Sequence, residues 1–216
     1  MDGKRASAGF GDAMQAVLAK LTGSRLFWVV FVGVLFALPL GRSMARTLPP
    51  SPPTIGEARP FELLDQYGSI VGTQQLLGHV WVVAQLPPEG AITHAEAIET
   101  VRTVIHRTKN LGTLFRMVTL PEEDRSALGE AERRILVEKY CSSSQLWLYL
   151  GGSAEQVERA KHALYDTVEL GGVGSAGGPV ALLLLDRRGA IRGAYGTDKA
   201  SIDRLMSDTS YIANLP

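Results

Sequence analysis

The stretch Gly78-His79-Val80-Trp81-Val82-Val83-Ala84-Gln85-Leu86 runs directly into Pro87-Pro88-Glu89-Gly90. It is an apolar run of strand length, rich in β-branched residues, and two prolines end it. Such a run predicts a strand that is buried on both faces, as in the centre of a parallel sheet. A helix is predicted to follow, and open α/β sheets place their chemistry where a central strand gives way to a helix. The residues at this corner therefore decide what kind of protein the chain is.

The segments on either side of this strand alternate between strand and helix patterns. A hairpin is predicted first, because two short apolar runs flank the turn Gln66-Tyr67-Gly68. Thr93-x-x-Glu96 and Ser153-x-x-Gln156 are capping boxes that begin two of the helices. The later strands are expected near 114–120, 145–150, 180–185 and 190–195, and the helices near 93–112, 126–140, 153–164 and 197–206. This order predicts an α/β fold, a thioredoxin-like mixed sheet flanked by helices.

Composition excludes several classes of function. The 216 residues carry 22 basic and 22 acidic side chains, and no basic tract indicates a nucleic-acid partner. Cys141 is the single cysteine, so the chain cannot form an internal disulfide, a thiol redox couple or a multi-thiolate metal site.

The N-terminal part predicts attachment to a membrane. Arg25 and Arg42 bracket an uncharged apolar segment, 26–41, which is slightly shorter than the roughly 20 residues of a spanning helix. Snorkelling of Arg25 can extend the span, and the basic residues before the segment favour an inside N-terminus. We expect a cytoplasmic tail, 1–23, followed by a single-pass signal anchor, 24–41. The alternative is a cleaved signal peptide that ends at Ser43-Met44-Ala45.

A proline-rich segment separates this anchor from the folded part. Residues 42–59 include Pro49, Pro50, Pro52 and Pro53, which predict a stiff, extended linker. The domain is expected at 60–216, in the periplasm or otherwise outside the cytoplasm.

Five segments of this domain carry a specific pattern. The most specific is Leu185-Asp-Arg-Arg-Gly189-Ala-Ile-Arg-Gly193, which continues to Tyr195-Gly196. The others are Phe61-Glu-Leu-Leu-Asp65-Gln-Tyr-Gly68, Leu77-Gly-His-Val-Trp-Val82, Pro121-Glu-Glu-Asp124 and Trp147-Leu-Tyr-Leu-Gly-Gly152. Taken in order, the five resemble the Sco/SenC family of membrane-anchored thioredoxin-like proteins. The resemblance implies a role in the assembly of respiratory cytochrome oxidase, through copper binding or thiol redox chemistry.

The chain departs from that family at each of its metal ligands. In the family a Cys-x-x-x-Cys motif follows the central strand and a histidine precedes the final hairpin, a donor set that suits copper. Here the corner reads Leu86-Pro-Pro-Glu-Gly-Ala-Ile-Thr93, the histidine position falls on Gly178, and the first aspartate of the acidic corner is Leu120. We therefore predict no catalytic residue, no cofactor-binding residue and no bound copper.

Two residues are the candidates for a rebuilt metal or thiol site. His94 is expected in the first turn of the helix after the central strand, with Glu89 or Glu96 as its nearest partners. Cys141 follows the second helix and is a candidate nucleophile or intermolecular disulfide. The alternatives are a solvated histidine and a small apolar cysteine at a helix end. Gly172-Val-Gly174-x-x-Gly177 fits a dinucleotide pattern only formally, because it precedes a strand.

The sequence thus favours a membrane-tethered, non-catalytic binding or assembly factor of Sco/SenC type. Its expected partner is another envelope protein or a respiratory complex. The alternative is a copper chaperone or thiol-disulfide oxidoreductase with a non-standard site, built from His94 and Cys141 or from ligands of a second copy. A decayed protein with little function is the third possibility.

Overall fold

The structure is a computed structural model that describes residues 22–44, 51–122, 129–140, 144–166, 168 and 182–215. The chain divides into two compact units, Met1–Pro50 and Ser51–Pro216. Each unit is described on its own.

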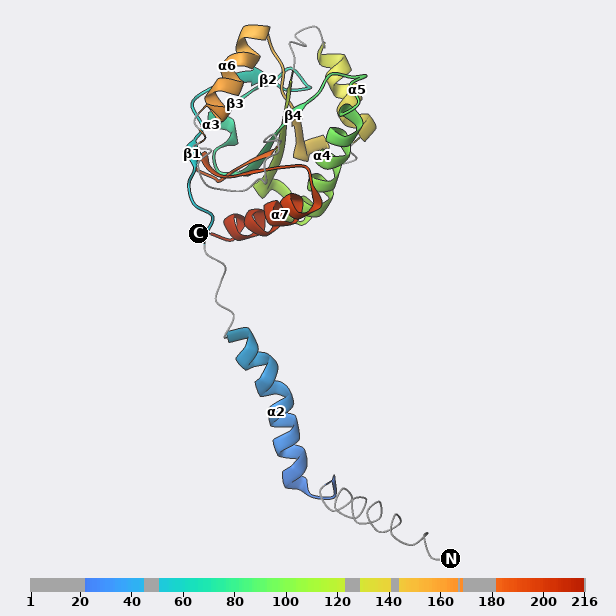
Figure 1. Cartoon of the computed structure of the whole chain (residues 1–216), viewed down its shortest axis with the longest axis vertical. Coiled ribbons are helices and arrows are strands. Elements are labelled where there is room, and N and C mark those ends of the chain that lie inside the picture. Colours follow the sequence, from blue (N-terminus) through green and yellow to red (C-terminus); the bar gives the residue numbers. More distant parts are fainter. Residues whose placement is uncertain are drawn as a thin grey trace, which may run out of the picture. The chain divides into compact units, whose positions relative to one another are not determined.

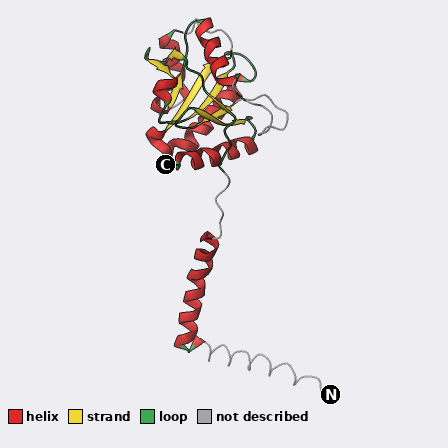
Figure 2. Ribbon diagram, turned by 90° about the vertical axis from the view of Figure 1, so that its left-hand side faces the viewer, coloured by secondary structure: helices red, strands yellow, loops and turns green. Residues whose placement is uncertain are grey.

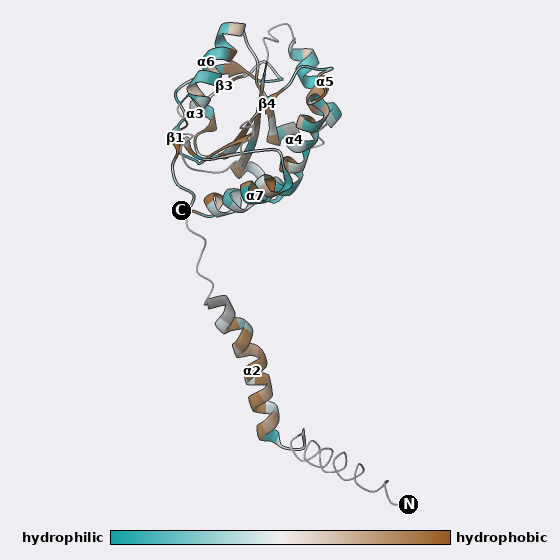
Figure 3. Cartoon of the chain, in the orientation of Figure 1, coloured by the Kyte–Doolittle hydropathy of each residue, from teal (hydrophilic) through white to brown (hydrophobic). Residues whose placement is uncertain are grey.

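The first unit contains helix α2, Arg25–Met44, with Pro39 inside it (Figure 1). Figure 3 shows that its residues are mainly hydrophobic. Phe27, Trp28 and Phe31 contact one another near its start, and the Trp28 indole donates to the Thr22 carbonyl at 2.8 Å. Within the described residues, no helix has both the length and the hydrophobicity that a membrane crossing requires. The anchor at 24–41 stays a prediction.

The second unit is built on a six-stranded mixed sheet with the order β1-β8-β7-β4-β5-β6. The central strand β4, the neighbouring β5 and the edge strand β6 run parallel. Strand β7 pairs antiparallel with β4, β8 with β7, and β1 with β8. The bounds are β1 Gly56–Glu57, β4 Val80–Leu86, β5 Phe115–Pro121, β6 Trp147–Tyr149, β7 Leu182–Leu185 and β8 Ala190–Tyr195.

Helices cover both faces of this sheet, as the red helices on either side of the yellow strands show in Figure 2. A separate hairpin of β2, Glu62–Leu64, and β3, Ile70–Gly72, packs with one layer. The helices are α3 Thr73–Leu76, α4 His94–Thr108, α5 Glu130–Tyr140, α6 Ala154–Tyr165 and α7 Lys199–Ala213, with short 3-10 turns at Lys109–Leu114 and Ser144–Leu146. The predicted mixed sheet flanked by helices is confirmed.

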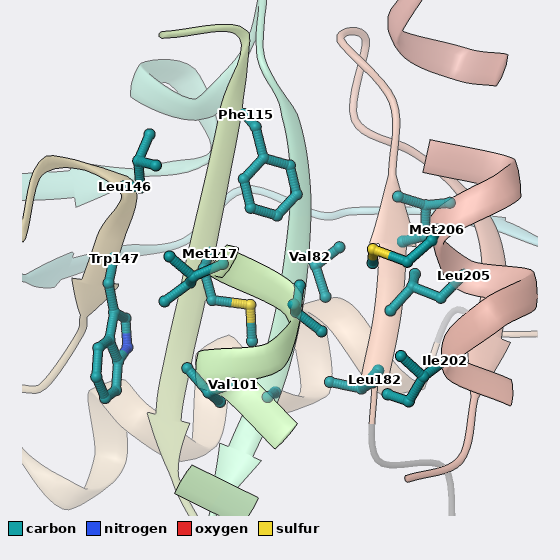
Figure 4. Packing of buried hydrophobic residues seen from close by; sticks show 14 of the residues in the cluster. Val82, Val101, Phe115, Met117, Leu146, Trp147, Leu182, Ile202, Leu205 and Met206 are labelled. Atoms are coloured by element: carbon teal, nitrogen blue, oxygen red, sulfur yellow. The ribbon is translucent and has the colours of Figure 1, made fainter. Parts of the chain in front are cut away.

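Strand β4 is buried on both faces, as its composition predicts. Val80 and Val82 pack with α4, α5 and α7, whereas Trp81 and Val83 pack with the hairpin, α3 and α6. All four side chains are fully buried. Figure 4 shows the first of these cores, where Met117 lies among side chains of β4, α4 and β5. Alternation along one strand thus builds two cores, which fix the position of the strand end.

The sheet begins earlier in the chain than the predicted domain start at 60. Strand β1 lies inside the segment predicted as the linker, 42–59, and the backbone N–H of Ala58 donates to the Gly189 carbonyl at 3.0 Å. The last residues of that segment are therefore part of the folded unit. The remaining boundaries, at 23 and 41, stay predictions.

Two local features differ from what the sequence pattern indicates. Thr93 precedes α4 in a helical conformation and makes no side-chain cap, so the capping box predicted there is absent. In α5 the apolar residue Ile135 is 61% exposed, whereas Arg133 and Val137 are buried. The helix presents Arg133 because its guanidinium donates to the Asp65 carbonyl at 3.0 Å. The capping box predicted at Ser153 is confirmed, and the Asp198 side chain caps the start of α7.

Candidate functional site

The corner after β4 is a compact series of turns. The Leu86 carbonyl accepts from the backbone N–H of Glu122 at 2.9 Å, which ties the strand end to the end of β5. Ala91 N–H then donates to the Pro88 carbonyl at 3.0 Å, and His94 N–H donates to the Ala91 carbonyl at 3.0 Å. These bonds fix the backbone where a sheet of this kind presents its chemistry.

Gly90 makes this path possible. Its φ of 94° lies in the left-handed region, which a residue with a side chain adopts only with strain. Pro87 and Pro88 precede it and end the strand. The residues that replace a Cys-x-x-x-Cys motif are thus suited to a tight turn.

His94 closes the same corner with its side chain. Its Nδ1 lies 2.7 Å from the Pro87 carbonyl oxygen. Because a carbonyl oxygen can only accept a hydrogen bond, Nδ1 carries the proton and the lone pair of the neutral ring is on Nε2. The contact links the first turn of α4 to the end of β4, in place of the missing Thr93 cap. His94 therefore has a structural role, and one ring nitrogen remains for any other contact.

The residues at this corner do not fit a copper site. Copper needs several nitrogen or sulfur ligands, and one imidazole nitrogen supplies a single ligand. In the part of the chain that the structure describes, no three His, Cys, Asp or Glu side chains are grouped to hold a metal, and His94, Glu89 and Glu96 form no such group. Cys141 and Gly178 lie outside the described residues. The expectation that the chain has no metal site stays a prediction.

Two side chains of α6, Lys161 and Tyr165, lie near the carboxyl ends of β4 and β5. Lys161 is largely buried, donates to the Glu122 carbonyl at 2.5 Å and forms an ion pair with Glu158 at 2.7 Å. One turn further along α6, burial raises the pKa of the Tyr165 phenol, and the side chain of Gln85 opposes this effect in part. The Lys161 ammonium group is thus engaged by two oxygen atoms, and the Tyr165 phenol stays protonated near neutral pH.

The most specific segment of the family resemblance proves to be structural. Asp186 accepts from the backbone N–H groups of Arg188 at 2.8 Å and Ala190 at 3.0 Å, and its other oxygen pairs with Arg192 at 2.7 Å. Arg187 donates to the Ala213 carbonyl at 2.7 Å and so fixes the end of α7. The charges of this segment therefore hold the β7–β8 hairpin and the end of α7.

Sequence reasoning missed a buried polar contact at the sheet edge. Gln66, predicted as a turn residue, is fully buried. Its amide donates to the Trp147 carbonyl at 2.9 Å and accepts from the Tyr149 N–H at 3.0 Å. One side chain thus occupies the outer edge of β6. No local pattern signals this contact, because its partners are distant in sequence.

Sequence reasoning also missed a cavity that lies away from the corner after β4. It has a volume of about 370 Å³ and lies between the hairpin, α3 and the start of α6. Its lining residues are Pro60, Phe61, Glu62, Thr73, Gln74, Gln75, Gln156 and Arg159. The only local signal in the sequence is the pair of glutamines that act as helix-capping residues.

Comparison with solved structures shows which known proteins share this architecture. BsSco, described as a member of the Sco family of cytochrome c oxidase assembly proteins, matches with a TM-score of 0.63, 15% identity, and coverage of 79% of this chain and 100% of that chain. A SCO1/SenC family lipoprotein from Bacillus anthracis matches with a TM-score of 0.61, 16% identity, and coverage of 75% and 98%. The fold is that of the Sco structures. The predicted resemblance to Sco/SenC proteins is thus confirmed at the level of the fold.

Yeast Sco1 with copper bound shares the Sco fold as well, with a TM-score of 0.53, 18% identity, and coverage of 76% of this chain and 96% of that chain. Copper is therefore bound on this fold elsewhere, whereas the described corner here does not fit it. No family model and no curated protein matches the sequence.

Proposed function

We propose that this chain is a membrane-anchored, non-catalytic Sco-like protein that assists the assembly of a respiratory cytochrome oxidase by binding another protein. The Sco fold supports the assembly role, because BsSco is described as belonging to a family of cytochrome c oxidase assembly proteins. The observation that carries the proposal is the corner after β4. There Pro87 to Gly90 form a tight turn, and the Pro87 carbonyl holds the His94 side chain.

The chemistry of this corner favours binding over catalysis. Thiol redox exchange needs two cysteines within one chain or a partner thiol, and this chain has one cysteine in all. The remaining Nε2 of His94 supplies one ligand to a metal that needs several. The backbone of the corner after β4 is held by hydrogen bonds, and the Ile92 side chain on it is 99% exposed. A rigid scaffold with exposed side chains suits protein recognition.

The anchoring part of the proposal rests on α2. Apolar side chains at successive positions along it are exposed, from 45% for Val32 to 73% for Leu26. Burial of such a surface contributes roughly 25 cal/mol per Å², and lipid can provide that burial. The basic residues before α2 favour an inside N-terminus, with the folded unit on the other side. Retention of the full chain in membranes after alkaline carbonate extraction is expected, and its release would contradict the anchor.

A gene-replacement experiment tests the assembly role. Deletion of the gene is expected to lower cytochrome oxidase activity in isolated membranes, and the full chain is expected to restore it. His94→Ala and Cys141→Ser should restore the activity as well as the unchanged chain does, at equal protein abundance. Loss of restoration by either variant would contradict a non-catalytic role. Unchanged oxidase activity after deletion would contradict the assembly role.

A further inference from the structure

The cavity beside α6 has features of a binding site that is separate from the β4 corner. Its volume of about 370 Å³ lies within the range of roughly 300–1,000 Å³ that ligand sites occupy. Three segments line it: the start of the hairpin, α3 and the first two turns of α6. Figure 1 shows these elements on the same side of the unit.

Two glutamines from different helices, Gln75 and Gln156, line this cavity. In each, the side-chain oxygen accepts from the backbone N–H of the N-cap residue, and with Ser153 this bond is half of a reciprocal capping box. The bond is 3.0 Å from Gly72 to Gln75, and 2.9 Å from Ser153 to Gln156. Because both oxygens are engaged, the amide orientations are fixed and each NH₂ group remains as a donor.

Arg159 adds a positive charge one turn further along α6. Its Nε donates to the Glu155 carbonyl at 3.4 Å, and the Glu155 carboxylate is 4.0 Å away. Both side chains are well exposed, so this pair is weak and the outer guanidinium nitrogens remain as donors. Glu62 is the one acid among the lining residues. Its formal charge balances that of Arg159, so the preference for a hydrogen-bond acceptor comes from the two amide groups and the guanidinium group.

An apolar surface continues from the cavity along the hairpin. Glu62 and Leu64 share the outer face of β2, and Leu64 pairs across the hairpin with Ile70. Leu64 is 40% exposed and Ile70 60%. The backbone of Leu64 also exchanges two 2.8 Å hydrogen bonds with Gly151, which fixes the strand beside the start of α6. A small free anion would use the donors and leave this apolar pair uncovered.

We propose that the cavity binds a carboxylate of a partner protein's peptide segment, with an apolar residue of that segment on Leu64 and Ile70. The Gln75 and Gln156 amides and the Arg159 guanidinium donate to the carboxylate, and Phe61 lines the floor. Phe61 is 8% exposed and packs on Trp81, with ring centres 6.4 Å apart, so the floor is rigid. The inference rests on the binding role proposed above and adds to it a second surface, apart from the β4 corner.

Calorimetric titration of the full chain in detergent micelles tests this proposal with three short peptides. N-acetyl-Leu-Asp-Leu amide carries a side-chain carboxylate, and N-acetyl-Leu-Ala-Leu carries a terminal carboxylate. N-acetyl-Leu-Asn-Leu amide is the neutral control. One carboxylate peptide is expected to bind at least tenfold more tightly than the control, and the better of the two identifies the source of the carboxylate. Equal binding of all three, or binding of none, would overturn the proposal.

Variants of the lining residues make the test specific to the cavity. Gln156→Glu keeps the capping box, since glutamate serves equally there, but replaces the donor with a negative charge. We expect it to weaken carboxylate binding at least tenfold while the thermal unfolding temperature stays unchanged. Arg159→Ala should weaken binding to a similar extent, and Glu62→Gln should strengthen it severalfold.

Arg134→Ala is the matched control, because Arg134 is likewise an exposed helical arginine beside a glutamate four residues away. It should leave peptide binding unchanged. Binding that Gln156→Glu and Arg159→Ala both leave intact would place the peptide elsewhere and refute the inference. The gene-replacement experiment measures oxidase activity and does not depend on peptide binding, so a failure of the proposed function and a failure of this inference are distinguishable.

Discussion

Asp186 is the residue on which the β7–β8 hairpin depends. Its side chain is 8% exposed, accepts two backbone N–H bonds and pairs with Arg192, which is 24% exposed. Removing one partner of a buried pair leaves a charge without compensation. Asp186→Asn is therefore expected to lower the free energy of unfolding by about 3 kcal/mol, measured by urea denaturation.

The Asp203–Arg107 pair provides the comparison for this prediction. It is shorter, at 2.6 Å, but its side chains are 51% and 40% exposed. Water screens such a pair, so Asp203→Asn should cost less than about 1 kcal/mol. Equal costs for the two variants would contradict the structural role of the buried pair.

The raised pKa values of two buried tyrosines predict how the free energy of unfolding changes at alkaline pH. Burial raises the pKa of Tyr165 and of Tyr195, and the Asp208 carboxylate, which accepts from the Tyr195 hydroxyl at 2.7 Å, raises the latter further. In the unfolded chain both phenols lose their protons near pH 10. The folded protein keeps these protons to a higher pH. The contribution of the two phenols to folding stability is therefore complete below about pH 10 and is lost as the pH rises above it.

Tyr165→Phe removes one such group and tests the sign of this dependence. The slope of unfolding free energy against pH above 10 should become shallower by up to about 1.4 kcal/mol per pH unit. Urea denaturation at pH 8 and at pH 10.5 measures the difference. An unchanged slope in this variant would show that the Tyr165 hydroxyl is not held protonated in the fold.

At the scale of the element, Gln66 closes the exposed edge of the sheet. Strand β6 is the last strand on its side, and unpaired edges invite association with other chains. Gln66→Leu keeps the size of the side chain but leaves the Trp147 carbonyl and the Tyr149 N–H without their partner. We expect a loss of roughly 2–4 kcal/mol in unfolding free energy.

Light scattering of the same variant should show an increased tendency to aggregate, because the β6 edge is opened. Gln145→Leu, at an exposed position just before β6, is the control and should change stability by less than about 0.5 kcal/mol. Equal behaviour of the two variants would mean that Gln66 does not protect the edge.

The same elements show what the sequence predicts and what it does not. Strand β4 and the inner faces of α4, α6 and α7 follow from periodicity alone, because burial dominates their positions. The inner face of α5 does not, since a long-range hydrogen bond from Arg133 to Asp65 orients that helix. A side chain that bonds to a distant backbone carbonyl leaves no mark on local pattern.

Some features of the candidate site can likewise be predicted from the sequence, whereas others need the structure. A missing cysteine pair can be read directly from the sequence, and so can the position of His94 at the corner after β4. The contact between His94 and the Pro87 carbonyl needs the structure, because it depends on how the turn closes. The cavity also cannot be found without the structure, because its lining comes from segments around residues 60, 74 and 157 that only the fold brings together.

At the scale of the whole molecule, the chain combines a Sco-type fold with a corner that carries no thiol pair. The two cores that fix β4 keep this corner in place whether or not it performs chemistry. The packing of the described residues in both cores involves no cysteine pair and no bound metal. The fold is therefore compatible with the binding role proposed above.

Titration of the purified full chain with Cu(I) against a competing chelator tests this account most directly. The account predicts no stoichiometric binding tighter than micromolar, and no difference between the unchanged chain and His94→Ala. One equivalent of copper bound more tightly than that, and lost in His94→Ala or Cys141→Ser, would contradict it.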